Sequence, residues 1–298
     1  MKMSKLDHNS RLGFVGAGMV GKSLALALSK IGYSVVAVSS RSFSSACELA
    51  ELVCGVTAYQ TVQEVAECAD IVFITVPDDA IESVASSVRW HTGQGTVHTS
   101  GVTSLDVLST AAQQGACVGA LHPLQTFSSI HDAVLSIPGS TFAIEGGGRI
   151  KTYLKEMTTN IGGTPIFLKS TDKALYHASV VMMGGLLTGF VALVADTWKH
   201  FGIEHEDAVR AIVPIIKGDA AALEAVGIPG ALAGPYVRGD VGTIRKHLDA
   251  IGKIDRNLLA IYRQMALMTF PYAIDKGKLD KSVAAKIRSM LVSANSDV

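Results

Sequence analysis

The chain has 298 residues, 48% of them hydrophobic, and this combination predicts two domains, each with its own core. Its 26 basic residues balance 26 acidic ones, so the formal net charge is +0, and no basic run is present that would neutralise a row of phosphates. Nucleic acid is therefore not expected as a partner. The apolar run Leu12–Met19 is too short to span a bilayer and contains glycines, so we expect a cytoplasmic protein with no membrane partner.

The four cysteines are scattered along the first 117 residues, at Cys47, Cys54, Cys68 and Cys117. They form no CxxC pair and have no histidine at ligand spacing, which zinc sites and redox motifs require. Disulfide frameworks belong mainly to small secreted domains. We therefore interpret the cysteines as buried thiols in a reducing compartment, and we expect no bound metal.

The first part of the chain alternates strand-like and helix-like segments. Leu12–Val15 is a short apolar run that ends in glycines, and Met19–Lys30 has apolar residues at helical spacing. Ser34–Val38 is apolar and β-branched without alternation, as in a parallel strand covered on both faces, and the helix-like segment Ser44–Val53 follows. These segments predict a complete βαβ unit.

The same alternation continues for about 170 residues. Further strands are predicted at Ile71–Val76, Thr96–Thr99, Cys117–Leu121, Thr141–Glu145 and Pro165–Leu168, with helices such as Val62–Cys68 and Ile150–Ile161 and a turn at Gly146–Gly148 between them. Strands that alternate with helices indicate the α/β class, here a doubly wound parallel-sheet Rossmann domain.

From Thr171 onward the pattern contains helices only. They are predicted at Lys173–His200, Glu206–Ile216, Val241–Ala250, Ile254–Lys276 and Lys281–Leu291. The domain boundary is therefore placed near Ser170, with a Rossmann domain at residues 1–170 and an all-α domain at residues 171–298. The unusually apolar stretch Ala178–Ala195 predicts a deeply buried helix of the kind found in dimer interfaces, and we expect a homodimer.

A glycine-rich loop follows the first predicted strand. Gly16-Ala17-Gly18-Met19-Val20-Gly21 matches GxGxxG and opens a helix within a βαβ unit, the context that makes this pattern informative. The first glycine permits a tight turn, the second admits a pyrophosphate close to the backbone, and the third packs helix against strand. The loop predicts dinucleotide binding; an ordinary glycine-rich turn is the alternative.

The end of the second predicted strand indicates which dinucleotide binds. An NAD enzyme places a carboxylate there, on the ribose hydroxyls, whereas this chain has Ser39-Ser40-Arg41-Ser42. Arg41 can pair with a 2′-phosphate through two hydrogen bonds, and the serines can complete the site. NADP (NADPH) is therefore favoured over NAD, with a solvated loop arginine as the alternative.

Two further strand ends outline a crevice beside this loop. Thr75-Val76-Pro77-Asp78 and Thr99-Ser100-Gly101 each end a predicted strand at the sheet edge where open α/β sheets bind ligands. Val76, Pro77, Ser100 and Gly101 are therefore predicted to line the nicotinamide side; simple strand ends without ligand contact are the alternative.

Three residues are candidates for acid/base chemistry. His122 follows the predicted strand Cys117–Leu121, where its side chain would point into the crevice and donate a proton to a carbonyl oxygen that receives a hydride. Lys173 and His177 lie four residues apart on one helical face, and either can donate a proton or hold a substrate group. A strand-capping His122 and an exposed Lys173 are the structural alternatives. Asp172 is interpreted as a helix cap.

The segment from Gly234 to Asp240 is predicted to be a loop between helices. Its Arg238 can hold a substrate carboxylate through two hydrogen bonds, or be an ordinary surface residue. Asp240 is predicted to cap the helix that begins at Val241.

At these residues the sequence resembles the 6-phosphogluconate-dehydrogenase-like superfamily of two-domain reductases, and within it Rossmann-like proteins with a helical C-terminal domain of unknown function. The segments that carry the resemblance are His122–Phe127, Lys173–Ala178, Gly234–Pro235 and Arg238–Asp240, in the expected order. Some relatives are similar to ketopantoate reductases, and more distant ones to pyrroline-5-carboxylate reductases and deazaflavin-dependent NADP reductases. The resemblance implies hydride transfer in a dimer with the active site between the domains.

One departure concerns the helix after Tyr176 and His177. Relatives commonly carry an asparagine there, whereas this chain has Gly184-Gly185, which removes a polar group that would orient a substrate. The leading hypothesis is an NADPH-dependent reductase of a small keto acid such as ketopantoate, with His122, Lys173 and His177 as acid/base groups. An imine reductase acting on a pyrroline-5-carboxylate-like molecule, or a non-catalytic NADP-binding sensor, are the alternatives.

Overall fold

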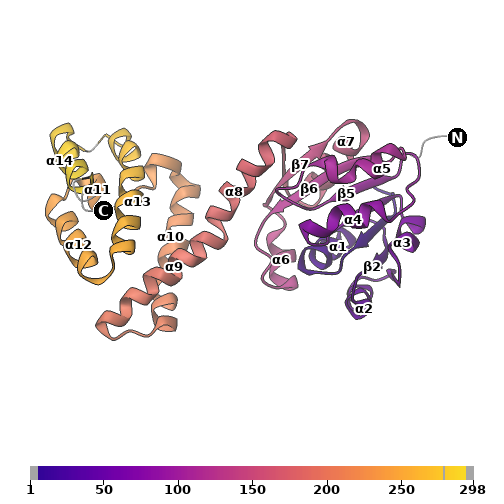
Figure 1. Cartoon of the computed structure of the whole chain (residues 1–298), viewed down its shortest axis with the longest axis horizontal. Helices are drawn as coiled ribbons and strands as arrows, with labels where there is room; N and C mark the ends of the chain where they lie inside the picture. Colours follow the sequence, from indigo (N-terminus) through magenta and orange to yellow (C-terminus); the bar gives the residue numbers. More distant parts are fainter. Residues whose placement is uncertain (1–5, 278, 293–298) are drawn as a thin grey trace. The chain divides into compact units, whose positions relative to one another are not determined.

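A computed structural model of the chain describes residues 6–277 and 279–292. Their contacts divide the chain into two compact units, one that ends at Thr188 and one that starts at Gly189. The N-terminal unit contains the sheet with its flanking helices, and the second unit is helical (Figure 1).

The sheet of the N-terminal unit has eight described strands in the order β3-β2-β1-β4-β5-β6-β7-β8. The strands are β1 (Leu12–Val15), β2 (Val35–Ser39), β3 (Thr57–Tyr59), β4 (Ile71–Ile74), β5 (Gly95–His98), β6 (Cys117–Leu124), β7 (Thr141–Gly146) and β8 (Thr164–Phe167). The chain starts in the middle of the sheet, builds outward to β3 and then returns to β4. The point of return, between β1 and β4, is the switch point at which open α/β sheets bind ligands.

Helices cover both faces of this sheet. They are α1 (Met19–Lys30), α2 (Phe43–Leu52), α3 (Val62–Cys68), α4 (Ile81–Ser86), α5 (Ser109–Gln113), α6 (Ile130–Ser136) and α7 (Gly148–Asn160). Side chains alternate between the faces of a strand, so Phe14 and Phe73 join the core under α1, α2, α6 and α7. Val15 and Val72 join the opposite core, under α3, α4 and α5. Burial on both faces explains why these strands are apolar throughout.

Three details of the sheet differ from the sequence prediction. β6 runs on to Leu124, so His122 lies within the strand rather than after it. β7 runs antiparallel to β6, with Ala143 opposite His122, whereas the other neighbouring strands are parallel. β3 was not predicted, because three residues are too short to show a period. The direction of a buried strand is set by its neighbours and leaves little trace in its composition.

The helical part begins with two helices, α8 (Lys173–Met183) and α9 (Gly185–Thr197), where the sequence predicted one. The break lies at Gly184, whose φ of −99° and ψ of −98° are not helical. The contacts divide the chain after Thr188 rather than near Ser170, because α8 packs with the sheet unit. The predicted boundary therefore coincides with the end of the sheet and not with the division between the compact units.

The second unit contains the remaining helices, α10 (His205–Gly230), α11 (Pro235–Arg238), α12 (Val241–Ile254), α13 (Arg256–Asp275) and α14 (Lys281–Val292). α11, α12, α13 and α14 share a core that includes Ile244, Phe270 and Ile287. The predicted loop at residues 234–240 contains one helical turn, and Asp240 caps α12 as predicted by accepting a hydrogen bond from the Thr243 amide at 2.9 Å. Non-helical backbone at Gly227 bends α10 near its end.

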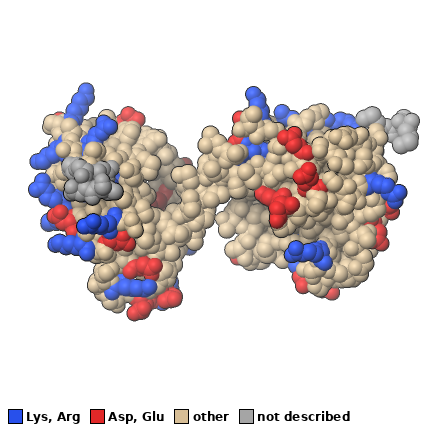
Figure 2. All heavy atoms as spheres, in the orientation of Figure 1, with Lys and Arg blue, Asp and Glu red and all other residues tan. Residues whose placement is uncertain are grey.

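The prediction that Ala178–Ala195 is deeply buried is wrong for this chain. Only Ala195 of α9 is buried, and apolar side chains are exposed along α8 and α9, among them Leu175 (79%), Met183 (69%) and Leu186 (61%). Between Ala174 and Ala195 the chain contains no Lys, Arg, Asp or Glu. The charged side chains seen in Figure 2 lie mainly on other parts of the molecule. By length and composition alone, the helical stretch Ser170–Phe201 is also apolar enough to cross a membrane. An apolar pattern predicts that a helix face is buried, but it does not identify the surface that buries it.

The cysteines are free, as expected, but they are less buried than predicted. Cys54 is exposed and the other three are half-buried. Within residues 6–277 and 279–292, no group of histidine, cysteine and acidic side chains could hold a metal ion.

Candidate active site

The glycine loop between β1 and α1 has a separate steric reason for each glycine. Gly16 has a φ of +105°, and a Cβ there would lie 2.6 Å from the Thr75 carbonyl oxygen. A Cβ on Gly21 would lie 2.4 Å from the Gly16 carbonyl oxygen, so this glycine lets α1 pack against the turn. A Cβ on Gly18 would meet nothing within 4 Å. The first and third glycines therefore shape the turn, and the second leaves its backbone open toward the neighbouring cavities.

One cavity of about 580 Å³ lies beside this loop at the ends of β1 and β2. It includes the predicted cofactor residues Gly16, Gly18, Ser39, Ser40, Arg41, Val76 and Pro77 in its lining. Arg41 is its one charged lining residue among the described part of the chain, and Ser42, Ser45 and Gln60 add polar groups. Ser45 and Gln60 were missed because neither belongs to a recognisable motif. The chemistry of this lining suits an anionic group rather than a cation.

A second cavity, of about 440 Å³, continues along the sheet edge. It shares Gly18, Thr75, Val76 and Pro77 with the first cavity. The rest of its lining is Met19, Val20, Asp78, Thr99, Ser100, Gly101, His122, Pro123, Gln125, Phe127 and His177. We call this second cavity the crevice. The structure thus brings together most of the predicted cofactor residues and two of the three predicted catalytic ones, while Gly21 stays in the helix packing.

Two imidazoles lie side by side in the crevice. The rings of His122 and His177 are 5.9 Å apart between centroids and nearly perpendicular. Gly101 lies against both, since a Cβ there would be 2.7 Å from His177 Cδ2 and 2.8 Å from His122 Nε2. The close fit of Gly101 explains why this position needs glycine even though its φ is ordinary.

Tyr176 determines how His122 is held. Its hydroxyl lies 2.9 Å from His122 Nδ1, and the two rings meet edge to face. Burial, then the charges of His177 and Lys173, lower the pKa of His122 to about 4, so the imidazole is neutral near pH 7. Burial also raises the pKa of Tyr176 to about 12, so the phenol keeps its proton. In the tautomer in which this phenol donates to Nδ1, the proton of His122 is on Nε2, which faces Gly101. Tyr176 was missed as a site residue, although it lies three residues after Lys173 on the predicted helical face.

Lys173 lies behind the crevice and not among its lining residues. Its side chain is 3% exposed, its Nζ is 3.2 Å from Glu145 Oε2 on β7, and it donates a hydrogen bond to the Ser100 carbonyl at 3.2 Å. The structural alternative of an exposed lysine at a helix start is therefore wrong. Burial lowers the pKa of Lys173, and the Glu145 carboxylate opposes that effect. Glu145 was missed because an acidic residue inside a strand resembles a solvent-facing one in sequence.

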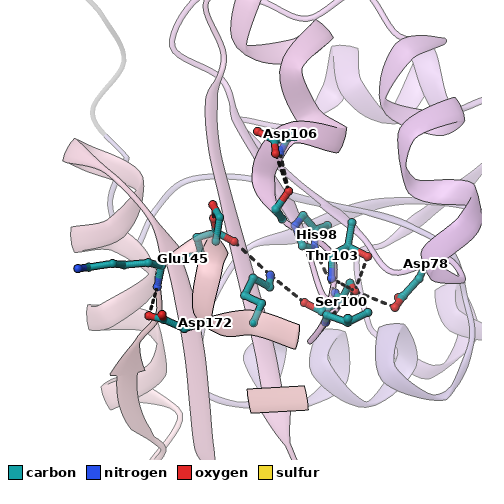
Figure 3. A network of polar contacts seen from close by, with 12 residues as sticks. Asp78, His98, Ser100, Thr103, Asp106, Glu145 and Asp172 are labelled. Carbon is teal, nitrogen blue, oxygen red and sulfur yellow. Dashed lines mark hydrogen bonds and ion pairs between the residues drawn. The ribbon is translucent and has the colours of Figure 1, made fainter. Parts of the chain in front are cut away.

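The turn after β5 forms a polar network that includes Asp78 (Figure 3). Ser100 Oγ donates to Asp78 Oδ2 at 2.8 Å, and the Ser100 amide donates to His98 Nδ1 at 3.1 Å. Thr103 also contacts Ser100 Oγ, at 2.9 Å. His98 is fully buried, and burial and the Lys173 charge lower its pKa to about 3. A neutral His98 acts as an acceptor that fixes Ser100, and Ser100 in turn fixes the Asp78 carboxylate at the crevice.

Arg238, the predicted substrate-binding residue, lies in the second unit as the last residue of α11, where it is exposed. Asp172 precedes α8, but its carboxylate accepts a hydrogen bond from the Lys169 amide rather than from the helix. Its predicted capping role is therefore replaced by a contact with the preceding turn.

Family models match the chain in two consecutive parts. Residues 3–123 match the Rossmann-like domain, and residues 140–269 match DUF2520, a domain of unknown function. No curated protein matches the chain.

Several solved structures are similar over most of the chain. A protein from Thermotoga maritima is 22% identical with a TM-score of 0.72, over 89% of this chain and 99% of that one. An imine reductase from Pseudomonas sp. is 20% identical with a TM-score of 0.62, over 95% and 99% of the two chains. A pyrroline carboxylate reductase from Plasmodium falciparum with NADP bound is 14% identical with a TM-score of 0.57, over 95% and 98%. At these identities the similarity concerns the fold. The chain therefore contains a segment that matches the Rossmann-like domain, followed by one that matches DUF2520.

Proposed function

We propose that this protein is an NADPH-dependent oxidoreductase that reduces a small molecule in the crevice. One observation carries the proposal: the cavity beside Arg41 and the crevice beside His122 and His177 share the Gly18 loop. A dinucleotide laid along the sheet edge would have its phosphates at that loop and its two ends in the two cavities. The similar folds of an imine reductase and of an NADP-bound pyrroline carboxylate reductase support the same conclusion.

The lining beside β2 supports NADPH over NADH. Arg41 and four serines line the cavity where the adenosine ribose would lie, and the lining contains no carboxylate among the described residues. A guanidinium binds a 2′-phosphate through charge-assisted hydrogen bonds, whereas an NAD site uses a carboxylate on the ribose hydroxyls. The residues present therefore fit the phosphorylated dinucleotide.

The two imidazoles are the groups we propose for the substrate side. When bound, the reduced nicotinamide supplies a hydride to the carbon of a C=O or C=N bond. His122, neutral and fixed through Nδ1 by Tyr176, presents Nε2–H as a hydrogen-bond donor to the heteroatom of that bond. His177 lies beside it at the crevice and can exchange protons with the substrate or with water.

The charge of the crevice favours an imine over a keto acid. Asp78 is its one formally charged lining residue apart from the histidines, and no lysine or arginine belongs to the described lining. A carboxylate stabilises the positive charge of a protonated imine, whereas an anionic keto acid would meet an unfavourable like charge. We therefore propose a protonated imine as substrate, the second of the two substrate classes that the sequence suggested.

We also propose that the protein is a homodimer that covers the apolar surface of α8 and α9. That surface holds exposed leucines and methionines, and exposed apolar patches of this kind mark interaction sites. A second copy of the chain supplies an apolar partner surface of the same composition.

A titration with both dinucleotides, followed by a substrate comparison, tests the proposal. We expect intrinsic fluorescence to report tighter binding of NADPH than of NADH. We also expect absorbance at the nicotinamide band to fall faster with a cyclic imine, 2-methyl-1-pyrroline, than with ketopantoate. Faster reduction of ketopantoate would support the keto-acid alternative, and binding without any turnover would support the sensor. Failure to bind either dinucleotide would refute the proposal.

The Asp78→Asn variant refines this substrate comparison. If Asp78 favours the charged imine, the variant should lose about tenfold in kcat/KM for the imine, which corresponds to about 1.4 kcal/mol, and should not lose activity with ketopantoate. Asp79→Asn, which changes the neighbouring carboxylate outside the crevice lining, is the matched control. An equal loss with both substrates would contradict a charge effect.

A further inference from the structure

A buried ion pair lies directly behind the crevice. Lys173 and Glu145 are 3% and 7% exposed, and Lys173 Nζ is 3.2 Å from Glu145 Oε2. Desolvation of two charges is costly, so a pair of this kind often contributes little net stability. The Ser170 hydroxyl donates a hydrogen bond to the other carboxylate oxygen of Glu145. The pair therefore calls for an explanation other than stability alone.

The pair connects β7 with two segments that line the crevice. Glu145 lies on β7, Lys173 is the first residue of α8, and Lys173 Nζ also donates to the Ser100 carbonyl in the turn after β5. Ser100 holds Asp78, and Gly101 packs against both imidazoles. Any movement of the lysine would therefore change the position of this turn.

The same lysine also fixes the helix that carries the other site residues. Tyr176 and His177 lie three and four residues after Lys173, on the same face of α8. Tyr176 reaches His122 on β6, and His177 lies beside that ring. Anchoring the first turn of α8 to β7 thus sets the distance between the two imidazoles.

Lys173 itself does not reach the crevice. It faces an internal gap that is lined by Gly101, His122 and Glu145 and is too small to hold a water molecule. A proton donor must lie within hydrogen-bond reach of the group that it protonates, or reach it through one water. Gly101 and His122 line both this gap and the crevice, whereas Lys173 lines only the gap, which has no room for a bridging water.

We propose that Glu145 and Lys173 are positioning residues, which hold the Ser100–Gly101 turn and the start of α8 so that His122 and His177 stay aligned, and that Lys173 takes no part in proton transfer. The inference rests on the proposed reductase function and changes the role that the sequence suggested for Lys173. It also assigns a role to Glu145, which no sequence pattern indicated.

The test uses the full-length protein and three variants. Lys173→Met alone leaves the Glu145 carboxylate buried without its partner and is expected to lower the melting temperature strongly. The double variant Glu145→Leu with Lys173→Met replaces both charges with apolar groups of similar size and is expected to restore much of that loss. Lys199→Met, which removes an exposed lysine from an ion pair with Asp196, is the matched control. Thermal unfolding separates folding from positioning.

Kinetics of the double variant then distinguish the two roles of Lys173. If the pair positions the site, its removal should lower kcat about a hundredfold. This is the loss expected when a catalytic group is displaced by about 1 Å. The NADPH dissociation constant should change less than about threefold, and the pH profile of kcat/KM should keep its shape. Loss of one limb of that profile would show that Lys173 transfers a proton, and an unchanged kcat would show that the pair positions nothing. Either result overturns the inference.

A measurement without substrate keeps this test separate from the proposed function. The ring signals of His122 and His177, followed by nuclear magnetic resonance, should shift in the double variant and remain in place in Lys199→Met. If the wild-type protein reduces no substrate but these signals shift, the proposed function fails and the positioning role stands. Unshifted signals contradict the positioning role whatever the activity.

Discussion

The contact of Gly101 with both imidazoles leads to the sharpest prediction, for the variant Gly101→Ala. The added Cβ would lie 2.7 Å from His177 Cδ2 and 2.8 Å from His122 Nε2, whereas ordinary contacts begin at 3.4 Å. The rings must therefore retreat by about 0.7 Å or the turn must move. His122 cannot move freely, because its Nδ1 is held by the Tyr176 hydroxyl at 2.9 Å.

The magnitude follows from this geometry. Overpacking by one methyl group costs about 1–3 kcal/mol in the free energy of unfolding, and the protein should remain folded. Displacement of a catalytic group by about 1 Å costs about a hundredfold in rate. We therefore expect kcat/KM for the imine to fall about a hundredfold, while the midpoint of denaturant unfolding moves only modestly.

The assay compares Gly101→Ala with Gly147→Ala. Gly147 precedes α7, has an ordinary φ of −134°, and a Cβ there would meet nothing within 4 Å. Both variants are measured by NADPH oxidation with the cyclic imine and by urea unfolding. Wild-type kcat/KM in Gly101→Ala would refute the reasoning, because it would show that the two imidazoles need not keep their places. A similar loss in Gly147→Ala would point to a general loss of stability instead.

Three further predictions concern the cofactor, pH and assembly. Arg41→Ala should weaken NADPH binding about ten- to hundredfold, the value of a charge-assisted hydrogen bond of about 1.5–3 kcal/mol, and leave NADH binding nearly unchanged in a fluorescence titration. His98 and His122 have folded pKa values of about 3 and 4, below the ordinary 6.5, so the unfolded state binds more protons below pH 6.5 and stability falls as pH falls. The free energy of unfolding, measured with urea, should fall by about 4 kcal/mol between pH 8 and pH 5. About half of this loss should be absent in His98→Asn. A free energy of unfolding that does not change with pH would show that the histidines are not buried in the neutral form. Light scattering should give a molar mass of about twice the chain mass of 31.3 kDa for the wild type. Met183→Lys should lower that mass toward the monomer value. A monomeric wild type would contradict the proposed dimer.

Local patterns predicted the parts of this protein that depend on short stretches of chain. The GxGxxG loop lies between β1 and α1 as expected, and each of its glycines has the predicted steric or open environment. The strand ends at Pro77 and Ser100 line the crevice, because parallel strands place their carboxyl ends at one edge of a sheet. These features follow from glycine sterics and from the spacing of apolar residues in strands and helices. Both depend only on residues that are close together in the sequence.

Partners distant in sequence decided the rest. His122 and Tyr176 are 54 positions apart and Glu145 and Lys173 are 28 positions apart, and no pattern in the sequence indicated that either pair would meet. The same residue types would be surface groups if β7 ran in the other direction or α8 started one turn later. Burial is also a property of the assembled molecule: the apolar face of α8 is exposed on the single chain, and the Lys173 charge is enclosed. The sequence by itself determined where a dinucleotide would lie, whereas only the tertiary structure decided which side chains face the substrate, because their neighbours come from distant segments.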